Sequence, residues 1–200
     1  MKVIVIGANG TIGELVQKAL AGGGHEIVKV GRKSGDFQVE IESRESVRKL
    51  YQAIGAFDAL AIAAGEVVFA PLSEFSSEKW QFSLGSKLMG QINLVQEAIP
   101  FIKEKGCFTL ISGVLNDDPI FAGVAASTIS GALEGFVRAA AIELPKGLRI
   151  NVVSPTILKE SEAQFGPFFP GTIPVEGWKV GQAYKRAILG AQTGHVYKVD

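Results

Sequence analysis

Short apolar runs alternate along the chain with longer segments in which apolar residues recur every three or four positions. The runs are continuous rather than alternating, which is typical of strands covered on both faces of a sheet. They predict strands at residues 2–6, 26–30, 37–41, 58–63, 107–111, 148–153 and 195–199. The helical periodicity predicts helices at residues 11–20, 44–54, 77–103, 124–144 and 180–189, the third of them ending near Pro100. Residues 154–177, rich in proline and phenylalanine, are predicted as an ordered loop.

Strands that alternate with helices indicate a parallel sheet built from right-handed βαβ units. One connection does not fit this pattern, because only residues 31–36 separate the second predicted strand from the third. A parallel crossover needs a dozen or more residues. Either a helix has been lost here, or residues 37–41 pair in another way.

Composition narrows the class of protein. Two hundred residues suit one domain, spanning residues 1–200. One cysteine allows no internal disulfide, and with only two histidines a Cys/His zinc site is not expected. Twenty basic side chains balance twenty acidic ones, so no charge pattern favours nucleic acid or an anionic membrane. No apolar stretch reaches the roughly 20 residues of a membrane span. We therefore expect a cytoplasmic protein.

A glycine-rich loop, GANGTIG, lies between the first predicted strand and the first predicted helix. Glycines at this spacing allow a sharp turn, close approach of a pyrophosphate, and tight packing of the helix on the sheet. The helix N-terminus then offers free N–H groups to the phosphates. The predicted cofactor-binding residues of the loop are Gly7, Asn9, Gly10, Thr11, Ile12 and Gly13. Thr11 and Glu14 also have capping-box spacing. The alternative is a tight turn that binds no ligand.

The end of the second predicted strand bears on which dinucleotide binds. NAD sites usually carry an acidic residue there, whereas NADP sites carry an arginine. This chain has Arg32, Lys33 and Ser34 instead, and Arg32 is well suited to a 2′-phosphate. The residues favour NADP over NAD. A solvated polar turn is the alternative, and Asp36 is close enough in sequence to reach a ribose.

Six segments, in their order and spacing, resemble the short-chain dehydrogenase/reductase family. They are GANGTIG (7–13), AIAAG (61–65), KLMGQINLVQEAIP (87–100), FTLISG (108–113), SGALEGFVRAAAIEL (130–144) and RINVVSPT (149–156). The resemblance implies a Rossmann-type, doubly wound sheet in the order 3-2-1-4-5-6-7, with helices on both faces and a bound nicotinamide dinucleotide. It also assigns cofactor contacts to Glu40, Ile41, Ala63, Ala64, Gly65, Pro155 and Ile157.

The resemblance does not extend to the four residues that carry the family's chemistry. The positions of its asparagine, serine, tyrosine and lysine fall on Lys87, Gly113, Ala126 and Ser130. No Tyr-x-x-x-Lys occurs anywhere in the chain. The chain therefore resembles a short member of the family in which the usual proton donor is absent.

Other residues are candidates for the missing chemistry. A desolvated Lys87 near the nicotinamide is a candidate proton donor, and Ser112 and Ser130 are candidates to bind a carbonyl oxygen. The alternatives are a surface lysine on a helix and two serines chosen for close packing. Val114, the 154–177 loop and Tyr184 are expected to complete a substrate pocket.

Two functional classes remain open at this point. One is an NADP(H)-linked oxidoreductase that acts on a small apolar carbonyl or alcohol with a replaced proton donor. The other is a dinucleotide-binding protein of the same fold that senses cofactor or binds a partner without turnover. For either class the resemblance implies a homodimer or homotetramer formed through helices 77–103 and 124–144.

Overall fold

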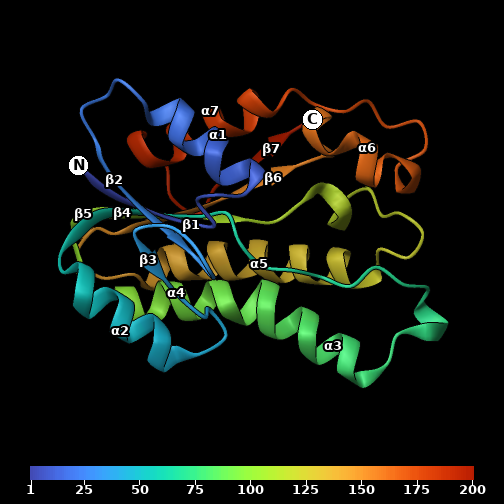
Figure 1. The fold of residues 1–200 in the computed structure, drawn as a ribbon, viewed down its shortest axis with the longest axis horizontal. Coiled ribbons are helices and arrows are strands. Elements are labelled where there is room, and N and C mark those ends of the chain that lie inside the picture. The colour runs from blue at the N-terminus through green and yellow to red at the C-terminus, as the bar shows by residue number, and fades with distance from the viewer.

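The structure is a computed structural model that describes residues 1–200. The chain forms one parallel seven-stranded sheet that lies between two layers of helices (Figure 1). The strand order is β3-β2-β1-β4-β5-β6-β7, which confirms the predicted fold class and topology. The strands are β1 (Lys2–Ile6), β2 (Glu26–Gly31), β3 (Phe37–Gln38), β4 (Phe57–Ile62), β5 (Ile102–Ile111), β6 (Arg149–Pro155) and β7 (Val196–Val199).

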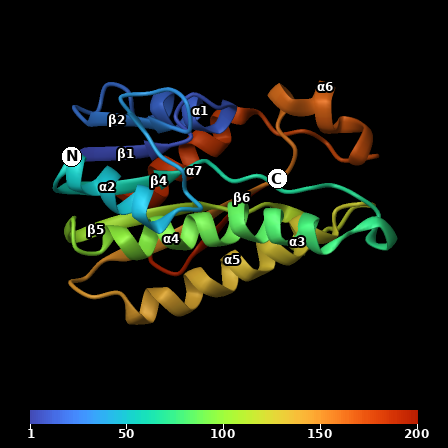
Figure 2. The same ribbon diagram turned by 60° about the horizontal axis from the view of Figure 1, so that its bottom comes forward.

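The helices divide between the two faces of the sheet (Figures 1 and 2). One face is covered by α1 (Thr11–Leu20) and α7 (Gly177–Leu189), which pack against each other. The other is covered by α2 (Arg44–Ile54), α4 (Gly90–Ala98) and α5 (Val124–Glu143). Five short segments lie in the loops: η1 (Leu72–Glu74), η3 (Val114–Asn116), η4 (Lys159–Ser161), α6 (Glu162–Phe165) and η5 (Gly166–Phe168). No helix combines the length and the apolar character needed to cross a bilayer.

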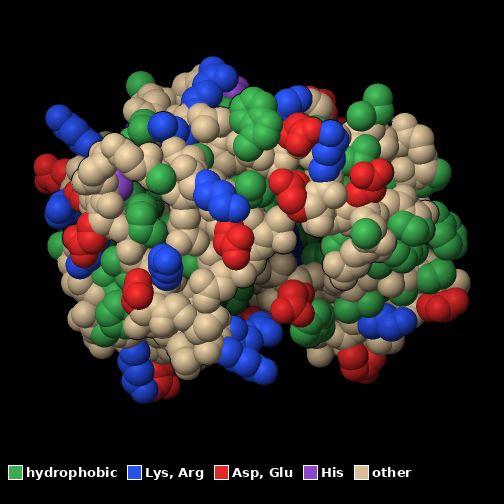
Figure 3. Space-filling view, turned by 45° about the horizontal axis from the view of Figure 1, so that its top comes forward, with side chains coloured by type: hydrophobic (Ala, Val, Ile, Leu, Met, Phe, Trp, Pro, Cys, Tyr) green, Lys and Arg blue, Asp and Glu red, His purple; other side chains and the backbone are tan.

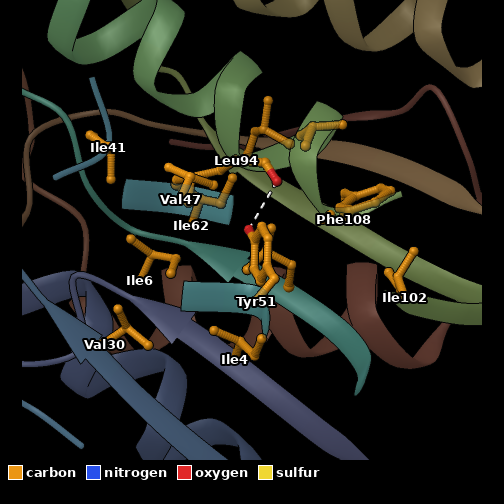
Figure 4. Close-up of a cluster of buried hydrophobic side chains, with 14 of the residues drawn as sticks. Ile4, Ile6, Val30, Ile41, Val47, Tyr51, Ile62, Leu94, Ile102 and Phe108 are labelled. Carbon is orange, nitrogen blue, oxygen red and sulfur yellow. Dashed lines mark hydrogen bonds between the residues drawn. The ribbon is translucent and has the colours of Figure 1, made fainter. Parts of the chain in front are cut away.

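Two apolar cores fill the space between the sheet and its helices. Under α2 and α4, the hydroxyl of Tyr51 donates to the Leu94 carbonyl at 2.9 Å, so this buried ring brings no unpaired polar group (Figure 4). On the opposite face, the fully buried Tyr184 donates its hydroxyl to the Ile62 carbonyl. The expectation that Tyr184 lines a substrate pocket is therefore wrong, because this ring belongs to the core.

The short connection between β2 and β3 has lost its helix, and yet the two strands pair in parallel. The Asp36 N–H donates to the Lys29 carbonyl and the Asp36 carboxylate accepts from the Lys29 N–H, each at 2.8 Å. Gly35 makes this return possible with a φ of +112°. The chain then runs forward beside Val30, but only residues 37–38 pair, rather than the predicted 37–41.

The long helix predicted over residues 77–103 ends near Pro100, as expected, but is not regular along its length. It comprises α3 (Ser77–Ser83), a π-helical turn η2 (Leu84–Met89) and α4, and it ends at Ala98. Pro100 has no N–H with which to continue the helix, and Phe101 donates to the Ala98 carbonyl to close the turn. As a result β5 begins at Ile102, five residues earlier than predicted. The other predicted boundaries lie within three residues of those observed.

Candidate functional site

The glycine loop brings β1, α1 and the end of β4 into very close contact. A Cβ atom on Gly7, whose φ is +78°, would lie 2.3 Å from the Ala63 carbonyl oxygen, and one on Gly13 would lie 2.1 Å from the Gly7 oxygen. These two glycines are required by the packing itself. A Cβ atom on Gly10 would meet only the Gly7 oxygen, at 3.4 Å. The outer side of Gly10 is therefore open to a ligand.

The N-terminus of α1 is not capped by any side chain. Gly10 is the N-cap residue and Thr11 is the first residue of the helix, so the predicted capping box is wrong. The reason is that Thr11 lies one position too late in the chain for its hydroxyl to reach the free N–H groups of the first turn. Those groups and the positive end of the helix dipole stay available to an anion.

A hollow of about 320 Å³ opens beside this loop, across the carboxyl ends of β1, β2 and β4. Its lining joins glycine backbone, apolar side chains and a polar end at Arg32 and Glu66. The lining residues are Ile6, Gly7, Gly10, Gly31, Arg32, Val39, Ile41, Ala63, Ala64, Gly65 and Glu66. Seven of the predicted cofactor residues are among them. This lining fits the adenosine part of a dinucleotide, because it combines open glycine backbone, apolar walls and a polar end.

Arg32 is surrounded by carboxylates. Its guanidinium nitrogens lie 3.5 Å from Glu40, 3.8 Å from Glu42 and 3.4 Å from Glu66. All four side chains are substantially exposed, and such ion pairs each contribute little to stability. The sequence prediction missed Glu42 and Glu66, because only the fold places them beside Arg32.

Other predicted ribose and phosphate contacts surround this hollow without lining it. The Asn9 amide donates to the Ser34 hydroxyl at 2.6 Å, which ties the glycine loop to the turn after β2. Lys33 is exposed, and its carbonyl accepts from Gln38. The Asp36 carboxylate is held by the Lys29 N–H and closes the turn. Asp36 therefore holds the turn together, and its carboxylate is not free to bind a ribose.

A second hollow, of about 250 Å³, lies at the carboxyl ends of β5 and β6. Its lining residues are Phe69, Ser112, Gly113, Val114, Leu115, Pro155, Thr156, Ile157, Leu158, Ser161, Phe165 and Phe169. Ser112 is 7% exposed, and its hydroxyl lies 3.5 Å from the Val153 carbonyl. A Cβ atom on Gly113 would be 3.8 Å from the Ser130 hydroxyl, so Ser130 lies beside Gly113 at the edge of the hollow but does not line it.

Lys87 is on the π turn and packs against the end of β4. A Cβ atom on Gly65 would lie 2.9 Å from both Cα and Cδ of Lys87, so only glycine leaves room for this side chain. The buried Gln91 amide donates to the Lys87 and Ile111 carbonyls, each at 2.9 Å, and so fixes Lys87 beside the strand that leads to Ser112. π turns occur frequently at functional sites.

Lys87 is half-buried, and its ammonium group forms no hydrogen bond or ion pair with the rest of the chain. Desolvation lowers its pKa to about 8. A lysine with this pKa exchanges protons near neutral pH. Lys87 does not line the second hollow, but it lies beside Gly65, at the edge of the first. Lys87 thus lies beside Gly65, which follows β4, and Ser112 follows β5 directly. Ser130 lies on α5 beside Gly113.

Comparisons with known proteins agree with this geometry. An uncharacterized oxidoreductase of Escherichia coli, YghA, is 27% identical over 135 residues, which cover 64% of this chain and 46% of that protein's length. The crystal structure of the protein lin1944 from Listeria innocua has a TM-score of 0.98 and 44% identity, over all of both chains. A small-chain dehydrogenase crystallised with NADPH shares the fold, with a TM-score of 0.88 and 24% identity over all of this chain and 96% of that one.

A sequence model for the family described as Enoyl-(Acyl carrier protein) reductase matches residues 1–175, which is most of the chain. The strand order and the glycine loop seen in the structure are those that the resemblance implied. The chain belongs to the short-chain dehydrogenase/reductase family.

Proposed function

We propose that the protein is an oxidoreductase that binds NADP(H) and interconverts a small carbonyl compound and its alcohol, with Lys87 in place of the family's usual proton donor. The observation that carries the proposal is the continuity of the site. The open side of Gly10 and the uncapped α1 face the first hollow, which extends to Gly65, and Lys87 packs against Gly65.

When bound, a reduced nicotinamide supplies a hydride to the carbonyl carbon of the substrate. The residues of the chain supply the rest. The Lys87 ammonium donates a proton to the carbonyl oxygen and is reprotonated from solvent. The hydroxyls of Ser112 and Ser130 donate hydrogen bonds to the same oxygen and orient it. The carbonyl thus gains one hydride and one proton and leaves as the alcohol.

Arg32, Lys33 and Ser34 support NADP as the preferred nucleotide. The three carboxylates hold the Arg32 guanidinium at the edge of the first hollow through long, exposed contacts. A 2′-phosphate, which carries more charge than any one carboxylate, competes for that guanidinium with short, bidentate hydrogen bonds. The neighbour crystallised with NADPH supports the same choice for this fold.

The second candidate function is a dinucleotide-binding protein without turnover. It is favoured by the residues at the family's catalytic positions on α5, which are Ala126 and Ser130, because neither can donate a proton as a tyrosine does. For both functions we propose a cytoplasmic homodimer or homotetramer that uses the face formed by α3, α4 and α5.

Calorimetric titration with NADPH and NADH, followed by a search for carbonyl-dependent loss of absorbance at 340 nm, separates these functions. We expect NADPH to bind more tightly than NADH. Replacement Arg32→Ala should weaken NADPH binding about tenfold to a hundredfold and change NADH binding little. Lys49→Ala removes an equal charge from the exposed side of α2 and should change neither. Absence of binding by both nucleotides contradicts the two functions together.

A further inference from the structure

The second hollow has an apolar lining with no charged side chain. We infer that the substrate is an uncharged, largely apolar aldehyde or ketone with about one ring, and not a keto acid or a sugar. This inference rests on the proposed function, since it specifies the substrate of the same site.

Aromatic side chains from two distant segments form much of the wall. Phe69 follows β4, whereas Phe165 and Phe169 belong to the segment between β6 and α7. The Phe69 ring lies 6.5 Å from that of Phe165 and 6.2 Å from that of Phe168, so the two segments are packed together over the hollow. Hydrophobic side chains gather at the edge of the molecule where this segment lies (Figure 3). Such a wall favours a flat apolar group on the substrate.

The polar side chains of the lining are three hydroxyls, of Ser112, Thr156 and Ser161. Ser112 and Thr156 are 7% and 8% exposed. Together with Ser130 beside Gly113, Ser112 can satisfy one carbonyl oxygen. A ketose brings several more hydroxyls, and each one buried without a partner lowers affinity by about tenfold to a hundredfold.

Carboxylate groups are disfavoured both inside the hollow and at its outer side. A neighbouring hollow shares Val114 and Thr156 with it and is also lined by three acidic residues, Asp117, Asp118 and Asp200. The cation there, Lys198, is already paired with Asp117 at 2.7 Å. An anionic substrate would therefore lie close to acidic groups. It would also lose its hydration against phenylalanine rings without gaining a cationic partner.

The volume sets the size of the part of the substrate that lies inside the hollow, which is open to solvent. At about 250 Å³ the hollow is smaller than the 300–1,000 Å³ of typical drug-sized pockets. Pro155 and Ile157, which the family resemblance assigns to the nicotinamide end of the cofactor, also line it. The space left for the substrate accommodates about one ring with a short side chain.

Matched substrates test the inference directly. Acetophenone and benzoylformate are both aryl ketones, and they differ in a methyl group against a carboxylate. With NADPH, we expect kcat/KM for acetophenone to exceed that for benzoylformate by at least about a hundredfold, and to exceed that for a ketopentose by a similar factor. Preferred turnover of benzoylformate or of the ketopentose overturns the inference.

Binding measurements keep the inference testable if no carbonyl is turned over. In that case the proposed catalysis fails, and calorimetry on the protein saturated with NADP⁺ compares 1-phenylethanol with mandelate, the two corresponding alcohols. Tighter binding of 1-phenylethanol supports the inference about the hollow. Tighter binding of mandelate, or binding of neither, overturns it.

Variants locate the preference in the hollow. Phe169→Ala should lower kcat/KM, or affinity, for the aryl compound about tenfold, because it removes part of the aromatic wall. Leu189→Ala removes a partly exposed apolar side chain from the end of α7, on the other face of the sheet, and should have no effect. Ser161→Arg adds a cation to the lining and should narrow the ratio between the neutral and the anionic ligand. Unchanged kcat/KM or affinity for the aryl compound in Phe169→Ala, together with an unchanged ratio in Ser161→Arg, overturns the assignment to this hollow.

Discussion

Lys87 lies beside the first hollow, and its positive charge has no partner in the chain. Burial lowers its pKa to about 8, whereas exposed lysines titrate near 10.5. Desolvation without compensation opposes folding, so a side chain kept for stability alone would be apolar here. Lys87 nevertheless stands next to Gly65, and only glycine at position 65 leaves room for it. This is the strongest residue-level support for a role of Lys87 in proton transfer.

Replacement Lys87→Met should lower kcat for carbonyl reduction by about 10²–10⁴-fold, because the ammonium is the proton donor. In the wild-type protein the rate of reduction should fall as pH rises through about 8, where Lys87 loses its proton. The variant should lack this pH dependence while it still binds NADPH. Single-turnover oxidation of NADPH over a range of pH measures both effects, and equal rates in the two proteins would remove Lys87 from the mechanism.

The same substitution should increase stability at neutral pH. Because the folded-state pKa of Lys87 is below the unfolded one, the unfolded chain binds more protons between about pH 8 and 10.5, and the stability of the wild type rises with pH across that window. Lys87→Met should therefore be more stable than the wild type by up to about 2 kcal/mol below pH 8. The difference should shrink toward pH 10.5. Urea unfolding at pH 7 and pH 10 tests this, and a variant that is less stable at pH 7 contradicts it.

At the scale of elements, the three glycines of the β1–α1 turn have separable tasks. Gly10→Ala should keep the fold, because its Cβ has room, but lower affinity for NADPH by at least about tenfold by intruding on the pyrophosphate. Gly13→Ala should destabilise the protein as well, since its Cβ would overlap the Gly7 carbonyl. Thermal unfolding and calorimetry together test the set.

The elements also show what sequence patterns can and cannot predict. Continuous apolar runs predicted the strands, because strands buried on both faces leave that pattern whatever surrounds them, and the family resemblance implied their order. The apolar pattern does not predict the exact end of the helix before Pro100 or the short β2–β3 return. Both are decided by local backbone geometry, such as the φ of +112° at Gly35. The glycine loop was predictable from its spacing. Glu42 and Glu66 beside Arg32, and Phe69 in the second hollow, were not, because they reach these places only through tertiary packing.

On the scale of the whole molecule, both hollows lie at the carboxyl ends of the parallel strands, where ligands of doubly wound sheets bind. The first hollow is at β1, β2 and β4, and the second at β5 and β6. The proposed function therefore places the nucleotide and the substrate side by side near the middle of the sheet, beside Gly65 and Ser112. This arrangement leaves the outer sides of α3, α4 and α5 free of any part in the site (Figure 2).

That free face is where we expect the subunits to associate. The outward side of α5 presents mainly small residues at helical spacing, and it ends in Ile142, which is 88% exposed. The exposed residues of α5 are Thr128, Ala132, Gly135, Arg138, Ala139, Ile142 and Glu143. Small side chains allow a second helix to approach closely, and exposed apolar area of this kind marks association surfaces in water. Two-fold packing of this face would bury Ile142 in each subunit.

Light scattering coupled to size exclusion tests this association. The wild-type protein should have a mass of at least twice the 21.2 kDa of the chain. Ala139→Arg places a long charged side chain in the centre of the contact and should yield the 21.2 kDa monomer with its fold and NADPH binding intact. Trp178→Arg removes an apolar residue, 60% exposed, from α7 on the opposite face and should leave the assembly unchanged. A 21.2 kDa wild type would show that α5 is a free surface.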